Sequence, residues 1–125
     1  RKRGGHLFSK SRFVAAQLEG YFEAGNWLET AAHANGMATR LAEGIREAGG
    51  RTAWPVEANE VFPILKRSRF ESLQAAGALL YEWPAKDLDP GHAPADDEVC
   101  LRMVCSFATG EADVEAFLKV LAGTV

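Results

Sequence analysis

The sequence lacks long apolar runs, has only two cysteines and carries no acidic residue in its first twelve positions. No stretch approaches the roughly 20 apolar residues that cross a bilayer. The basic start leads into Gly4-Gly5-His6 rather than into the apolar segment of a signal peptide. Without a CxxC pair or a His/Cys cluster, the two cysteines predict a reduced, cytoplasmic protein that has no metal site.

The composition is that of one globular domain. The chain has 125 residues, 47% of them hydrophobic and 25% charged, which excludes a disordered chain. The net charge of -3 is unevenly placed, because residues 1–12 hold five cations and the remainder therefore carries -8. This asymmetry predicts that the start of the chain contacts something anionic. The chain begins at Arg1 without a methionine, so we expect it to be part of a longer protein.

Hydrophobic periodicity predicts an α+β fold. Apolar positions at helical spacing predict helices over residues 11–22 and 26–48, a short helix over 68–76 and a last helix after Thr109. Strands are expected at residues 51–55, 59–65, 78–83 and 98–107, and a solvated loop at 84–97. We expect the helices to pack on a small, three- or four-stranded, mostly antiparallel sheet.

The basic opening is one candidate site. Arg1, Lys2 and Arg3 are followed by Gly4 and Gly5, whose missing side chains let backbone N–H groups approach an anion such as a phosphate. The alternative is a basic terminus in solvent.

Arg102 is the second candidate, because it interrupts an apolar segment. An arginine among apolar residues needs a partner, and its planar fork fits a carboxylate in two parallel hydrogen bonds. Two alternatives stay open: a strand face exposed to water, or an ion pair within the protein.

Other polar residues favour structural roles. Asn59 precedes a strand and either binds a ligand or organises its own turn. His6, His33 and His92 have no spacing that indicates a metal site. Cys100 and Cys105 lie five residues apart, so in a regular strand they face opposite ways and do not form a disulfide.

Residues 1–10 and 12–17 resemble the segment that follows the cofactor-lysine region in low-specificity L-threonine aldolases. The resemblance continues at residues 33–35, 55–62 and 101–107 and in the last helix, so it spans essentially the whole chain. It implies the C-terminal small domain of a fold-type I pyridoxal-phosphate enzyme. Residues 1–125 would then be a single C-terminal domain, with residues 1–24 as a connector helix region and 26–125 as a small α+β domain.

That family cleaves L-threonine or L-allo-threonine to glycine and acetaldehyde with pyridoxal phosphate, which acts as the electron sink. The resemblance implies that Arg102 holds the substrate α-carboxylate and that Lys2 lies near the cofactor phosphate. It places Arg3, Gly4 and Gly5 near the cofactor as well, reaching a neighbouring subunit's site. The implied whole enzyme is a cytoplasmic homo-oligomer with a large N-terminal domain and an amino-acid substrate.

The chain departs from the family in one respect that decides its activity. The family's Schiff-base lysine lies between a serine and a glycine, upstream of the segment matched here, and no lysine of this chain has that setting. We therefore predict that the chain alone cleaves no threonine. A non-catalytic module that binds an amino acid or another partner is the alternative. The acidic remainder of the chain argues against a nucleic-acid partner.

Overall fold

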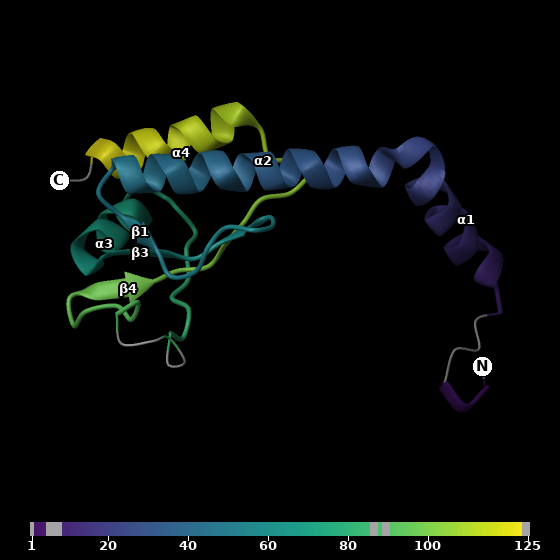
Figure 1. The fold of residues 1–125 in the computed structure, drawn as a ribbon, viewed down its shortest axis with the longest axis horizontal. Coiled ribbons are helices and arrows are strands. Elements are labelled where there is room, and N and C mark those ends of the chain that lie inside the picture. Colours follow the sequence, from purple (N-terminus) through teal and green to yellow (C-terminus); the bar gives the residue numbers. More distant parts are fainter. Residues whose placement is uncertain (1, 5–8, 86–87, 89–90, 124–125) are drawn as a thin grey trace.

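The computed structural model of the chain describes residues 2–4, 9–85, 88 and 91–123. The helices in this part are α1 (Ser11–Phe22), α2 (Asn26–Glu47), α3 (Arg67–Ala75) and α4 (Glu111–Gly123), with two 3-10 turns, η1 (Lys2–Gly4) and η2 (Glu23–Gly25). All four predicted helices are present. Helix α2 forms one side of the molecule, α4 lies beside its C-terminal half, and α1 projects at its other end (Figure 1).

The break between α1 and α2 is made by two residues with left-handed backbone. Ala24 has a φ of 54° and Gly25 a φ of 78°. Glycine adopts this conformation freely, whereas alanine there is strained by about 1–2 kcal/mol. The predicted interruption at Gly25 is therefore confirmed, and these two residues set the direction in which α1 leaves α2.

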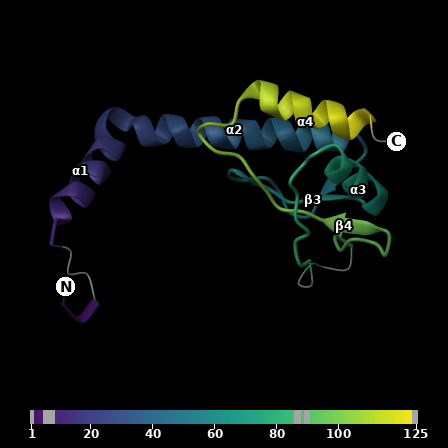
Figure 2. The same cartoon turned by 180° about the vertical axis from the view of Figure 1, so that it is seen from behind.

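The core lies under the C-terminal half of α2. The buried positions of α2 recur at helical spacing: Ala34, Met37, Ala38, Leu41, Ala42 and Ile45. The apolar periodicity predicts one seam that also includes Trp27 and Ala31, but these two residues are exposed. Gly44 faces Leu118 of α4 so closely that a methyl group in its place would overlap the leucine side chain. Figures 1 and 2 show α4 alongside α2 from both sides, with α3 and the sheet below the pair.

The strands form two small antiparallel sheets. A three-stranded sheet has the order β1 (Arg51–Thr52), β3 (Pro63–Lys66) and β4 (Glu98–Cys100), and a two-stranded one joins β2 (Glu60–Val61) to β5 (Met103–Val104). The predicted α+β class with helices on a small antiparallel sheet is confirmed.

Two predicted strands, 59–65 and 98–107, are each divided into two. The pairs on both sides of the break share one register, with Val61 opposite Met103 and Ile64 opposite Cys100. The break coincides with Pro63, which has no N–H to donate to the ladder, although its carbonyl still accepts from the Leu101 N–H. The two segments therefore form one interrupted ladder.

The predicted strand over residues 78–83 is wrong. Only Glu82 forms an isolated bridge, with Leu101, and Trp83 N–H donates to the Cys100 carbonyl. Leu79 and Tyr81 are 88% and 77% exposed, whereas Ala78 and Leu80 pack against the core, so the alternation reflects a half-buried segment that does not pair as a strand.

Arg51 and Glu98 fasten the loop that precedes β4. Arg51 donates to the carbonyls of His92 and Ala93 and to Oε2 of Glu98, at 3.0, 2.9 and 2.7 Å. The same Glu98 oxygen accepts the Ala95 N–H at 3.0 Å. The Ala95 N–H first, and then Arg51, hold the pKa of Glu98 below its usual value.

We expect Glu98→Gln to lower the free energy of unfolding near pH 7 by about 1–1.5 kcal/mol, the difference between hydrogen bonds to charged and to neutral groups, because glutamine keeps an acceptor oxygen but loses the charge. Because the folded-state pKa is lowered, this stabilisation is present above the ordinary glutamate pKa and is lost as the pH falls through the folded value. Urea unfolding should therefore show the two proteins converging in acid. Glu43→Gln, which removes an exposed carboxylate of α2, should change stability by less than about 0.5 kcal/mol. An acid-independent loss in Glu98→Gln would contradict this explanation.

Candidate functional site

Arg102 lies where one sheet passes into the other, between the end of β4 and the start of β5. Glu60 pairs with Val104, and the shared register places Phe62 opposite Arg102. Because side chains two residues apart share a face of a strand, these four side chains lie on one face. Glu60 is thus the diagonal neighbour of Arg102, a position within reach of long side chains.

The Arg102 guanidinium contacts an acid and an aromatic ring. Its Nε donates to Oε1 of Glu60 at 3.0 Å, and its Nη2 donates to the same oxygen in a short contact. Its Cζ lies 5.3 Å from the centroid of the Trp83 ring, within the range of a cation–π attraction.

The structure combines the two alternatives left open for Arg102, because it forms an ion pair within the protein on a strand face that is open to water. The Arg102 and Glu60 side chains are 42% and 36% exposed, and pairs this exposed contribute only about 0–1 kcal/mol to stability. Arginine has five N–H donors, and Glu60 engages two of them. Among the described residues no other acceptor contacts Arg102, so donors remain for a carboxylate from outside.

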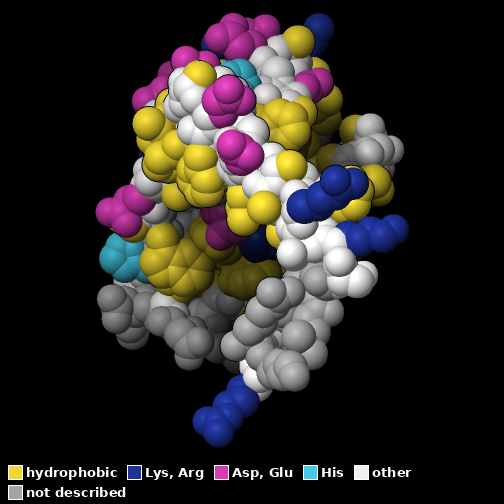
Figure 3. All heavy atoms as spheres, turned by 90° about the vertical axis from the view of Figure 1, so that its right-hand side faces the viewer, with side chains coloured by type: hydrophobic (Ala, Val, Ile, Leu, Met, Phe, Trp, Pro, Cys, Tyr) yellow, Lys and Arg dark blue, Asp and Glu magenta, His cyan; other side chains and the backbone are white. Residues whose placement is uncertain are grey.

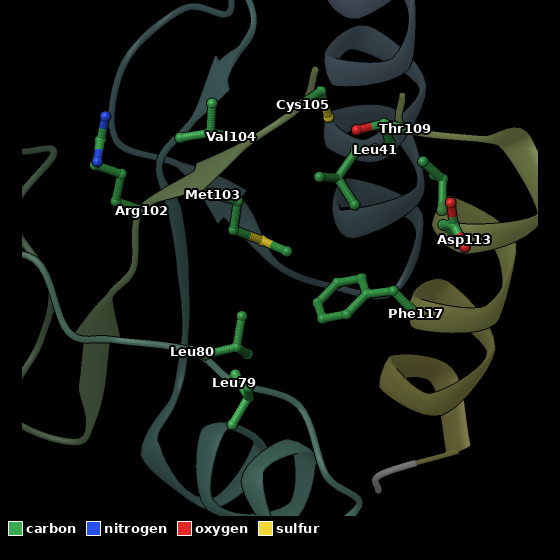
Figure 4. Close-up of a pocket in the computed structure, with 11 residues that line it drawn as sticks. Leu41, Leu79, Leu80, Arg102, Met103, Val104, Cys105, Thr109, Asp113 and Phe117 are labelled. Atoms are coloured by element: carbon green, nitrogen blue, oxygen red, sulfur yellow. The ribbon is translucent and has the colours of Figure 1, made fainter. Parts of the chain in front are cut away.

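A cavity of about 300 Å³ lies between α2, α4, residues 79–80 and residues 102–105 of this junction, so Arg102 is one of its lining residues. Its wall is mostly apolar and includes Leu41, Met103 and Phe117. In Figure 4 the Met103 side chain points toward Leu41 and Phe117, whereas that of Arg102 points away from them. The cavity is therefore not a carboxylate pocket built around the guanidinium.

The structure does not bring the basic opening and Arg102 together. Lys2, Arg3 and Gly4 form η1, which lies beyond α1 at the opposite end of the molecule from α3 and β4 (Figure 1). Arg3 and Gly4 are exposed, and Gly5 lies outside the described residues. The cofactor roles expected for these four residues stay predictions.

Asn59 and His33 make structural contacts. The Asn59 side-chain amide donates to the Cys105 carbonyl at 2.7 Å, and the Cys105 N–H donates to the Asn59 carbonyl at 2.8 Å. His33 Nε2 lies 2.7 Å from the Thr109 carbonyl and so ties α2 to the segment before α4. His33 therefore has the structural role expected for it, whereas Asn59 holds a distant segment rather than its own turn.

The two thiols are buried and free, so the expectation that no disulfide joins them is confirmed. Burial raises the pKa of both Cys100 and Cys105. Because the thiolate is the reactive form, neither is set up as a nucleophile.

Three of the lysine side chains that the structure describes lie at the surface. Lys66 donates to Asp97 at 2.7 Å, and Lys10 and Lys119 are exposed. No charged side chain is buried in the described ranges. The same residues contain no group of three or more His, Cys, Asp or Glu side chains that could hold a metal ion. None of the helices that the structure describes is long and apolar enough to cross a membrane.

Sequence comparison relates the chain to curated enzymes. No protein-family profile matches it. It is 36% identical over 114 residues to the low specificity L-threonine aldolase of Pseudomonas sp. (strain NCIMB 10558), which covers 90% of this chain and 30% of that protein. It is 42% identical over 81 residues to the enzyme of the same name from Pseudomonas aeruginosa, covering 64% of this chain and 23% of that protein.

Structure comparison agrees. The threonine aldolase of Leishmania major superposes with a TM-score of 0.80 and 30% identity, over 96% of this chain and 32% of that one. Serine palmitoyltransferase of Sphingomonas wittichii, at 20% identity, shares only the fold, with a TM-score of 0.57 over 74% of this chain and 23% of that one. The chain is therefore similar, over most of its length, to low-specificity L-threonine aldolases, and it spans between 23% and 32% of the length of these relatives.

Proposed function

We propose that the chain is the C-terminal portion of a pyridoxal-phosphate-dependent aldolase that cleaves L-threonine or L-allo-threonine to glycine and acetaldehyde. The observation that carries this is the 36% identity over 90% of the chain, together with the TM-score of 0.80 to a threonine aldolase. The whole protein would be a cytoplasmic homo-oligomer, and the cofactor would be held mainly by residues outside this chain.

The chain's own part in that reaction would be to bind the substrate with Arg102. A guanidinium that offers two parallel N–H groups fixes a carboxylate in orientation as well as in position. Holding the α-carboxylate in this way would orient the Cα–Cβ bond that breaks, which is a positioning role. The donors that Glu60 leaves unused support this role.

The shape of the molecule supports a connector role for residues 1–24, with residues 26–125 as the small domain. Helix α1 has no buried residue, and an isolated helix of 12 residues is marginal in water. Its large apolar side chains are each between 46% and 56% exposed: Phe13, Val14, Leu18, Tyr21 and Phe22. Figure 3, which faces this end of the molecule, shows hydrophobic side chains gathered there. In the whole enzyme the large domain or a second subunit would cover them.

The proposed function is tested by comparing the chain alone with a hybrid enzyme. In the hybrid, this chain replaces the matching segment of the Pseudomonas sp. aldolase. We expect the chain alone, with added pyridoxal phosphate, to release no acetaldehyde from L-threonine and to form no borohydride-trapped lysine adduct. We expect the hybrid to release acetaldehyde. A folded hybrid that binds the cofactor but is inactive would argue for a non-catalytic module, and a trapped lysine in the chain alone would overturn its predicted inactivity.

A further inference from the structure

Three side chains on the face that carries Arg102 form a connected row of aromatic rings. Trp54 and Phe62 meet edge to face with centroids 4.9 Å apart, and Phe62 and Trp83 lie 5.8 Å apart. Trp83 then contacts the Arg102 guanidinium. The backbone of Trp83 is held beside β4 as well, since the Trp83 N–H donates to the Cys100 carbonyl at 2.8 Å. The Trp83 ring, which contacts the guanidinium, therefore packs against a second ring, that of Phe62.

Glu60 holds the guanidinium from a different direction. Both of its hydrogen bonds come from the Nε–Nη2 edge of Arg102 and end on one oxygen, Oε1. The opposite edge, formed by Nη1 and the second N–H of Nη2, has no acceptor among the described residues. That edge has the two parallel donors that a carboxylate needs, and the Arg102 side chain is open to solvent.

We propose that Glu60 and Trp83 are positioning residues, which hold the Arg102 guanidinium so that its Nη1–Nη2 edge is presented to the carboxylate of a small amino acid. The inference rests on the proposed function of Arg102 as a carboxylate binder. A long arginine side chain loses rotamer freedom when it binds a ligand. In this chain the ion pair with Glu60 and the contact with Trp83 already restrict the rotamers of Arg102 before a ligand binds. Less conformational entropy is then lost on binding, so binding is opposed less.

The first test measures the order of the arginine side chain without any ligand. We expect NMR relaxation of the Arg102 Nε–Hε group to show a more ordered side chain in the wild-type chain than in Glu60→Ala or Trp83→Leu. The matched variants Glu60→Gln and Trp83→Phe keep an acceptor oxygen and an aromatic face, so they should keep most of the order. Both positions are surface-accessible, and thermal unfolding should confirm that each of the four variants is folded. Equal order in all five proteins would overturn the proposal.

The second test titrates glycine into the same proteins and follows the Arg102 Nε–Hε signal. We expect Glu60→Ala and Trp83→Leu to bind roughly twofold to tenfold more weakly than wild type, the range for one ordered side chain. Glu60→Gln and Trp83→Phe should stay within about twofold of wild type by the same reasoning. Tighter binding by Glu60→Ala would make Glu60 a competitor for Arg102 and overturn the proposal.

Arg102→Lys separates this inference from the function on which it rests. For this variant, which has no Arg102 Nε–Hε group, glycine binding is measured by isothermal titration calorimetry. If wild type and Arg102→Lys bind glycine alike, the carboxylate-binding role itself fails in this chain. If Arg102→Lys loses binding while Glu60→Ala and Trp83→Leu bind as wild type does, the carboxylate role holds and only the positioning role fails.

Discussion

Arg102→Lys in the hybrid enzyme is expected to lower kcat/KM for L-threonine by roughly 10- to 150-fold, since a hydrogen bond to a charged group is worth about 1.5–3 kcal/mol. Lysine keeps the charge but loses the planar pair of donors, so the substrate carboxylate is held less tightly and in a less defined orientation. Weaker binding of the carboxylate raises KM, and a less defined orientation of the bound substrate lowers kcat. Steady-state kinetics that report the two constants separately will show how the effect divides.

Arg67→Lys is the matched control for this variant. Arg67 is also a surface arginine paired with a glutamate, because its two Nη atoms donate to the two carboxylate oxygens of Glu82 at 2.8 and 3.4 Å. Glu82 already accepts from both Nη atoms of Arg67, so we expect no role for Arg67 in binding substrate. The substitution of Arg67 should therefore change kcat/KM by less than about twofold, as expected for an exposed pair. If both variants behave alike, the carboxylate-binding role of Arg102 is wrong.

Ile45→Ala is expected to lower the free energy of unfolding by about 2–5 kcal/mol, the usual cost of truncating a buried isoleucine to alanine. Ile45 is fully buried on the inner face of α2, and the Gly50 backbone approaches it so closely that an added methyl group would overlap its Cγ2. The surrounding atoms therefore have little room to close the cavity that the substitution leaves. Most domains have only about 5–15 kcal/mol of stability, so the loss should be plain in urea unfolding.

Leu28→Ala controls for side-chain size and for the helix. Leu28 has the same number of atoms as Ile45 and also belongs to α2, but it is 55% exposed. Its truncation should cost less than about 0.5 kcal/mol. A cost as large as that of Ile45→Ala would show that the N-terminal half of α2 is covered in solution, for instance by a second copy of the chain.

The helices could be predicted from the sequence because their signal is local. In α2 the spacing of Ala34, Ala38, Leu41 and Ile45 repeats the helical period, and the core-facing residues follow it. The strands were less predictable. Residues 78–83 have strand-like composition, but whether they pair depends on other segments, and only Glu82 does so, as an isolated bridge.

The residues of the candidate site, too, could be predicted only in part from the sequence. Arg102 could be identified from its apolar neighbours alone. Glu60 and Trp83 could not, because their contact with Arg102 depends on the register between segments about 40 residues apart and on the path of residues 82–83 beside β4. Glu60 is one residue of a motif whose resemblance to threonine aldolases was already apparent, yet its partner is visible only in three dimensions.

The single register shared by the two sheets limits which changes in chain length the protein can accept. Residues 67–97 join the two paired segments, so an insertion in their exposed parts leaves every pair from Glu60–Val104 to Lys66–Glu98 in place. An insertion of one residue next to Pro63 would instead turn Glu60 to the opposite face from Arg102, since neighbouring residues of a strand alternate. The number of residues between Glu60 and Pro63 therefore determines whether Glu60 lies on the same face as Arg102.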